Sequence, residues 1–232
     1  MATISENLQA VRARIERAAR AAGRDPAHIR LVAVSKTWPA EMVREAAAAG
    51  QRAFGESYLQ EALKKMDALA DLPLEWHFIG PLQSNKTTPV AERFDWVHAV
   101  DRLKVAQRLS AARPAGRPPL MICIQVNVSG EVSKRGVAPD GAAVLARQAA
   151  RLRGLKMRGL MAIPEPTDDV AIQHARFRQL RRLGDELNEA GVGLDTLSMG
   201  MSEDLEAAIA EGATIVRVGT AIFGERRGPR HP

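Results

Sequence analysis

The sequence has few of the features that mark secreted or membrane-bound proteins. It contains a single cysteine, Cys123, so no disulfide can form within the chain, and a reducing cytoplasm is its expected location. No apolar run reaches the ~20 residues that a membrane-spanning helix needs, and the N-terminus lacks a secretory signal pattern. We therefore expect a cytoplasmic protein that has no membrane partner.

Aromatic residues are also scarce. They make up only 4% of the 232 residues, and none is interleaved with a basic cluster as a platform for stacking nucleic-acid bases requires. Most of the net charge of +6 comes from the two ends, because residues 1–30 carry +3 and residues 225–232 carry +2. A basic first helix and a basic tail explain this charge, so no nucleic-acid partner is expected. The five histidines lack metal-ligand spacing, and no metal site is predicted.

Short β-like segments alternate with helical segments along the chain. This alternation favours a parallel sheet, and a count of eight favours closure into a single α/β (TIM-type) (β/α)8 barrel. The predicted strands are Arg30–Ser35, Arg52–Phe54, Glu75–Ile79, Trp96–Val100, Leu120–Val128, Lys156–Ala162, Leu194–Leu197 and Thr214–Val218. We expect one domain over residues 1–232, with an extra N-terminal helix within 1–28 that opens on a capping box at Thr3 to Glu6. Residues 225–232 are predicted to form a disordered tail.

Lys36 stands where the first predicted strand ends. Active sites of (β/α)8 barrels form where the strands end and the following loops begin. A lysine held at the mouth of an apolar barrel loses hydration, which favours its neutral amine, and a neutral amine is suited to imine formation with a carbonyl compound. A single lysine after a strand is more often a surface residue, so this interpretation depends on its neighbours.

Two loops rich in serine and glycine follow the last two predicted strands. They are Ser198–Glu203 and Gly219–Gly224. Glycines let backbone N–H groups approach a ligand, and hydroxyl groups add further donors to an anion. Either loop alone is typical of an ordinary cap or turn. Together they occupy the usual phosphate position of this fold, so a phosphate site is predicted.

Arg217 lies between branched apolar residues in the last predicted strand. A buried guanidinium needs an acceptor for its N–H groups. The sequence leaves two alternatives open, which are a carboxylate inside the barrel and a bound ligand.

Six segments of the chain resemble signatures of the pyridoxal phosphate homeostasis protein family, whose barrel is similar to the N-terminal domain of bacterial alanine racemase. Their order and spacing are intact over roughly residues 30–224. The segments are Val34–Thr37, Phe54–Glu61, Trp76–Lys86, Gly159–Pro164, Ser198–Ser202 and Val218–Gly224. The family usually has asparagine where this chain has Ser57, which retains a donor and an acceptor but has a shorter reach.

The resemblance implies that the chain binds pyridoxal 5′-phosphate (PLP) covalently, as a Schiff base on Lys36. It assigns the phosphate of PLP to four residues: Ser198, Ser202, Gly219 and Thr220. It assigns the pyridine nitrogen to Arg217, and the pocket of the ring to Asn127 and Met161.

Two roles compete for such a PLP-binding barrel. One is PLP homeostasis without robust catalysis, and the alternative is an amino-acid racemase. A two-base racemase needs a second acid or base opposite the lysine, which in the similar racemase fold is a tyrosine contributed by a C-terminal domain. We expect no room for such a domain after the eighth predicted strand, and the only tyrosine, Tyr58, is expected to pack early on a helix. We therefore expect a monomeric homeostasis factor without catalytic residues, whose candidate protein partners are PLP-dependent apoenzymes.

Overall fold

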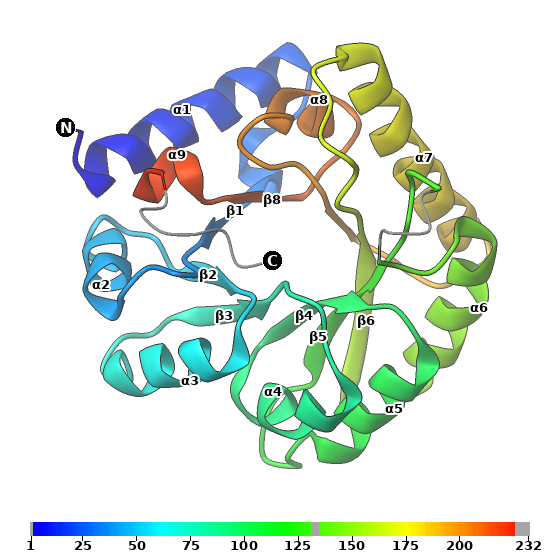
Figure 1. Cartoon of the computed structure of the whole chain (residues 1–232). Coiled ribbons are helices and arrows are strands. Elements are labelled where there is room, and N and C mark those ends of the chain that lie inside the picture. Colours follow the sequence, from blue (N-terminus) through cyan, green and yellow to red (C-terminus); the bar gives the residue numbers. More distant parts are fainter. Residues whose placement is uncertain (1, 131–134, 226–232) are drawn as a thin grey trace.

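The alternating apolar segments form eight parallel strands that close into a barrel, shown in Figure 1 as a computed structural model that describes residues 2–130 and 135–225. The strands follow chain order around the barrel, and β1 closes on β8 with Ala33 opposite Val218. Their bounds are β1 Arg30–Val34, β2 Ala53–Glu56, β3 Glu75–Phe78, β4 Trp96–Val100, β5 Leu120–Gln125, β6 Leu155–Met161, β7 Thr196–Ser198 and β8 Ile215–Val218. The predicted (β/α)8 barrel is confirmed.

Helices connect the strands and cover the outside of the barrel (Figure 1). Their bounds are α1 Ile4–Ala21, α2 Ala40–Ala48, α3 Leu59–Ala68, α4 Thr87–Arg93, α5 Leu103–Ala112, α6 Pro139–Ala150, α7 Val170–Glu189, α8 Leu205–Ala210 and α9 Thr220–Phe223, with short 3₁₀ turns at Pro26–His28 and Ser84–Lys86. Among the described residues, no helix combines the length and apolar character needed to span a membrane.

The extra N-terminal helix α1 begins as the sequence predicts. The Thr3 side chain accepts from the Glu6 N–H, and the Glu6 carboxylate accepts from the Thr3 N–H, so both halves of the capping box are present. The apolar face of α1 packs against α8 and α9, which places this helix beside the loops that follow β7 and β8 (Figure 1). Of the predicted disordered tail at 225–232, residues 226–232 lie outside the described residues.

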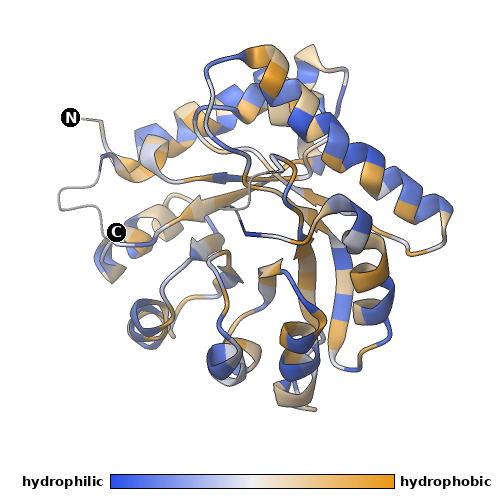
Figure 2. Cartoon of the chain, turned by 45° about the vertical axis from the view of Figure 1, so that its right-hand side comes forward, coloured by the Kyte–Doolittle hydropathy of each residue, from blue (hydrophilic) through white to orange (hydrophobic). Residues whose placement is uncertain are grey.

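The buried apolar side chains form two layers. The larger layer lies between the strands and the helices, and Figure 2 shows the apolar strands at the centre with hydrophilic stretches on the outer faces of the helices. The smaller layer fills the inside of the barrel and contains Val32, Ala53, Trp96, Ala99, Cys123, Met161 and Ile215. Successive side chains of each strand point alternately into these two layers.

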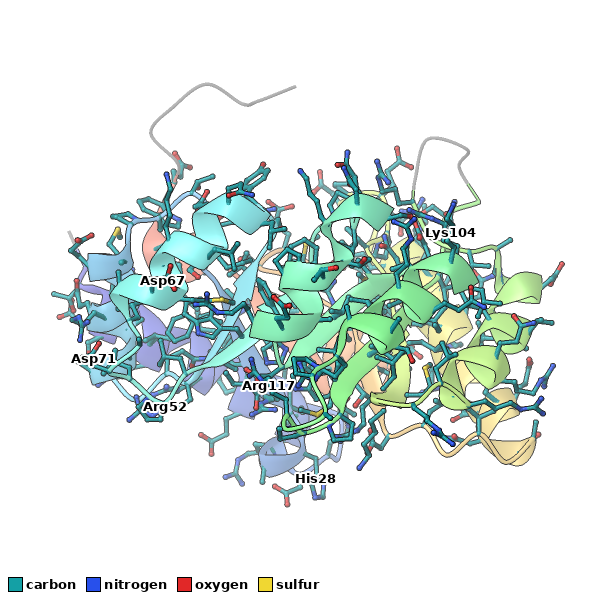
Figure 3. The ribbon with its side chains drawn as sticks, turned by 90° about the horizontal axis from the view of Figure 1, so that it is seen from below. His28, Arg52, Asp67, Asp71, Lys104 and Arg117 are labelled. Atoms are coloured by element: carbon teal, nitrogen blue, oxygen red, sulfur yellow. The ribbon has the colours of Figure 1, made fainter. Side chains whose placement is uncertain are left out.

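Figure 3 shows the common direction of the strands. His28, Arg52 and Arg117, which precede β1, β2 and β5, lie toward one end of the barrel, whereas Lys104, near the start of α5, lies toward the other. The loops that follow the strands therefore gather at one end, as they do in other barrels of this class.

Candidate functional site

A cavity of about 430 Å³ opens at the C-terminal ends of the strands. Its volume falls within the range of small-molecule sites. Five of the eight predicted site residues line it: Lys36, Ser202, Arg217, Gly219 and Thr220. The cavity therefore brings together an amine, a guanidinium group and two hydroxyl groups. A second cavity, of about 420 Å³, lies at the opposite end of the barrel, and none of the predicted site residues lines it.

The backbone before Lys36 is held by buried hydrogen bonds. The Ser35 hydroxyl donates to Glu56 Oε1 at 2.6 Å, and Lys65 Nζ donates to the Ser35 carbonyl at 2.6 Å and to Glu56 Oε1 at 2.8 Å. Burial raises the pKa of the Glu56 carboxyl even though its contacts with Lys65 and Ser35 act in the opposite direction. These bonds fix the point from which the half-buried Lys36 side chain departs.

The backbone after Lys36 is strained. Thr37 has φ of 70°, a conformation that is unfavourable for a β-branched residue. Its N–H group donates to Glu61 Oε1 at 2.6 Å. Strained residues of this kind persist only where surrounding contacts hold them, and they concentrate at functional sites. The sequence does not predict this feature, since backbone strain has no signature in residue type.

Arg217 is a buried cation that faces the cavity. The residue is 3% exposed, and its guanidinium donates from Nη1 to Ser198 Oγ at 2.6 Å and from Nη2 to the Ala162 carbonyl at 2.9 Å. Burial lowers its pKa to about 10, which leaves it protonated at neutral pH. Neither partner carries a charge, and no described carboxylate forms an ion pair with it. Of the two alternatives, the structure thus disfavours the internal carboxylate.

The three remaining predicted residues do not line the cavity. Ser198 is fully buried, and its hydroxyl lies between Arg217 and His98 Nδ1, at 2.7 Å from the latter. Met161 belongs to the layer inside the barrel, and Asn127 Oδ1 accepts from the Gly130 N–H at 3.2 Å. The ligand contacts assigned to these three residues stay predictions.

The loop after β7 is held in place by a glycine conformation and by a contact from α1. Gly200 has φ of 94°, and a Cβ there would lie 2.6 Å from the Ala208 side chain, so only glycine fits. Arg14, from α1, donates to the Ser202 carbonyl at 2.7 Å and forms an ion pair with Glu206. Arg14 is not predicted from the sequence, because it lies far from Ser202 in the chain.

The loop after β8 approaches β1 closely. A Cβ at Gly219 would lie 3.2 Å from the Val34 carbonyl oxygen, which is tighter than most such contacts. This approach brings Gly219 and Thr220 to the same cavity as Lys36. Ser57, the departure from the family pattern, also lines the cavity.

Comparison with known proteins shows the family of this chain. The family model described as alanine racemase, N-terminal domain, matches residues 7–227. A pyridoxal phosphate homeostasis protein of Pseudomonas aeruginosa is 66% identical over 226 residues, which cover 97% of each chain. The chain belongs to the pyridoxal phosphate homeostasis protein family. A Vibrio cholerae member of the family is 53% identical over 230 residues, which cover 97% of this chain and 98% of that protein.

A solved structure of the family holds the cofactor. PipY of Synechococcus elongatus, whose structure was determined with PLP bound, superposes with a TM-score of 0.82 at 39% identity and covers 96% of this chain and 100% of PipY. The family resemblance inferred from the six sequence segments is therefore confirmed, and binding of PLP is established for a relative that matches along nearly the whole chain.

Proposed function

We propose that this chain binds PLP as a Schiff base on Lys36 and serves intracellular PLP homeostasis without robust catalysis. The observation that carries the proposal is the shared cavity of Lys36 and Arg217. A primary amine and a buried guanidinium with unused N–H groups match the aldehyde and the ring nitrogen of PLP. The names of the relatives and the PLP-bound structure of PipY support the same ligand.

The residues around the cavity fit the rest of PLP. Ser202, Gly219 and Thr220 line it from the loops after β7 and β8, which is where barrels of this class bind phosphate. Their hydroxyl and backbone N–H groups would hold the phosphate. Bound PLP would supply the aldehyde carbon for the imine and a ring that can act as an electron sink, whereas the protein supplies orientation and charge.

Two features favour a role without robust catalysis. A guanidinium at the ring nitrogen opposes protonation of that nitrogen, which weakens the ring as an electron sink, but racemases that share this feature make it the lesser of the two. Tyr58 is 47% exposed and is not among the residues that line the cavity, so it is badly placed to serve as the second base of a racemase. The names of the relatives point in the same direction.

The remaining parts of the proposal concern the setting of the protein. We place it in the cytoplasm as a monomer, with PLP-dependent apoenzymes as its protein partners. The lack of a second cysteine with which Cys123 could form a disulfide supports a reducing location.

PLP titration followed by absorption tests the proposal. Wild-type protein should give the visible band of a Schiff base, Lys36→Ala should lose the band, and the surface variant Lys64→Ala should retain it. Arg217→Met should weaken PLP binding, because a buried hydrogen-bond donor is removed. A Lys36→Ala protein with an unchanged band would refute the assignment of the lysine.

A further inference from the structure

A chain of hydrogen bonds crosses the inside of the barrel and ends at Arg217. Arg217 Nη1 donates to Ser198 Oγ at 2.6 Å, and Ser198 Oγ lies 2.7 Å from His98 Nδ1. His98 Nε2 lies 2.9 Å from His77 Nδ1, and His77 Nε2 lies 2.6 Å from Glu75 Oε1. These residues come from β8, β7, β4 and β3, and the chain runs from the cavity toward the opposite end of the barrel.

The two ends of this chain have fixed roles. A guanidinium group has only donors, so Arg217 can only donate to Ser198. At the other end, burial acts to raise the pKa of the Glu75 carboxyl, but the contacts with His77 and Arg30 outweigh it and the pKa is lowered. Arg30 forms an ion pair with Glu75 at 2.9 Å. Glu75 is therefore ionised at neutral pH and can only accept.

The fixed ends determine the hydrogen positions in between. Because Glu75 accepts, His77 must carry its hydrogen on Nε2, and the Nδ1 of a neutral His77 is then an acceptor. His98 must donate to that atom from Nε2, so its own Nδ1 accepts the hydroxyl hydrogen of Ser198. The hydroxyl oxygen is left to accept from Arg217. Every bond of the chain points the same way, and both histidines are neutral Nε2–H tautomers.

The surroundings favour the neutral form of both histidines. Burial lowers the pKa of His77 despite the opposing contact with Glu75, and burial together with the charge of Arg217 lowers the pKa of His98. The His77 ring also stacks on Trp96, with the ring centroids 5.4 Å apart and the planes 9° apart. An additional proton on His98 would face a buried site that already holds the Arg217 cation.

We propose that Glu75, His77, His98 and Ser198 act as positioning residues that hold the Arg217 guanidinium toward the ring nitrogen of PLP. This rests on the proposed function, in which Arg217 faces that nitrogen. The chain of hydrogen bonds restrains Nη1 of Arg217, and the Ala162 carbonyl, at 2.9 Å, restrains Nη2. The remaining N–H groups of the guanidinium are then aimed by the barrel itself. Because both histidines are neutral and their hydrogen bonds point in one direction, they can position Arg217 without placing a further charge beside it.

The hydrogen positions are tested on the protein without PLP. Nuclear magnetic resonance of ¹⁵N-histidine-labelled protein at neutral pH distinguishes a protonated ring nitrogen from an unprotonated one. Variants His77→Gln and His98→Gln assign the signals, and the exposed His28 serves as an internal reference. Both buried rings should show the Nε2–H tautomer. An Nδ1–H tautomer or an imidazolium at either residue would overturn the directed chain, whatever the protein does with PLP.

The positioning role is tested by comparing the affinity for PLP with the affinity for an analogue in which the ring nitrogen is replaced by C–H. The ratio of the two affinities is called the preference for PLP. His98→Leu removes the acceptor of the Ser198 hydroxyl, and we expect it to reduce this preference roughly tenfold, as for loss of one hydrogen bond to a charged group. His98→Gln, whose amide can still accept and donate, should recover part of the preference. Ile215→Val, which trims the inside of the barrel but removes no hydrogen-bonding group, should retain it in full.

The results for Arg217→Met and His98→Leu show whether the proposed function or the positioning role fails. If Arg217→Met keeps the full preference for PLP, the assignment of Arg217 to the ring nitrogen fails. If Arg217→Met loses the preference but His98→Leu keeps it, the contact stands and the positioning role is refuted. If His98→Leu does not fold, the tautomers of the wild-type protein and the preference shown by His98→Gln still decide the question.

Discussion

Acid should destabilise this protein through the two histidines buried inside the barrel. His77 and His98 are both fully buried, and burial lowers the pKa of each below its ordinary value of 6.5. The unfolded chain takes up a proton at each histidine as the pH falls through 6.5, whereas the folded chain does not. The free energy of unfolding therefore decreases as the pH falls through this range.

The size of the effect follows from proton linkage. A histidine that has a pKa of 6.5 in the unfolded state and stays neutral in the folded state over this range loses about 1.4 kcal/mol of stability between pH 7.5 and pH 5.5. For His98, whose pKa is lowered furthest, we expect this full value, and for His77 up to the same amount. Together they remove about 1.4–2.8 kcal/mol, a substantial part of the stability of a typical domain.

Urea unfolding of the PLP-free protein at the two pH values measures this loss. The quantity of interest is the stability difference between pH 7.5 and pH 5.5 within each protein. His98→Gln should reduce that difference by about 1.4 kcal/mol even if it lowers stability at both pH values. The exposed His28→Gln should keep the wild-type difference, as a matched surface control (Figure 3).

Other ionisable groups also contribute to the stability difference between pH 7.5 and pH 5.5 in the wild-type protein. The test therefore compares this difference between the wild-type protein and each histidine variant. Glu75, Arg30 and Asp95 act on His77, and Arg217 acts on His98. Burial raises the pKa of Glu56, which stabilises the folded state as the pH falls and so opposes the histidines. The variant comparison removes these contributions. An unchanged pH difference in both His77→Gln and His98→Gln would refute the claim that these rings are neutral when buried.

Three further predictions concern the phosphate, the barrel and catalysis. Ser202→Ala with Thr220→Val should weaken PLP binding about tenfold per hydroxyl, measured by titration, and equal losses for pyridoxal, which lacks the phosphate, would contradict a phosphate role. Gly159→Ala should cost more than about 2 kcal/mol in urea unfolding, since its Cβ would clash with the backbone of Thr196, and a near-neutral result would show that β6 and β7 can separate. The PLP-loaded protein should not racemise alanine above a Lys36→Ala control, and turnover that is lost in Tyr58→Phe would favour the racemase alternative.

Much of the fold could be predicted because apolar periodicity and turn residues report local structure. The strand Trp96–Val100 and the capping box at Thr3 have the predicted residues. Other strand ends differ by a few residues: the fifth ends at Gln125 instead of Val128, because the chain leaves the sheet there and Val126 only bridges to Val137. Such ends are set by pairing between strands, which a single segment does not specify.

The site could be predicted in part. Lys36, Ser202, Arg217, Gly219 and Thr220 were found because they end strands or lie in loops with a family signature, and the fold brings such positions to one end. The chain of buried partners behind Arg217 could not be found, since His77 and His98 pair across strands and resemble ordinary core residues in the sequence. The same holds for Arg14, whose contact with the phosphate loop depends on how α1 packs.

The central claim is that PLP is attached to Lys36, and borohydride reduction followed by peptide mapping tests it most directly. Reduction of the PLP-loaded protein converts an imine into a stable secondary amine, so the modified lysine can be located by mass spectrometry. We expect a pyridoxyl group on the peptide that contains Lys36, and no such peptide from Lys36→Ala. Stoichiometric label on another residue, such as Lys65 or Lys86, with Lys36 unmodified would contradict it.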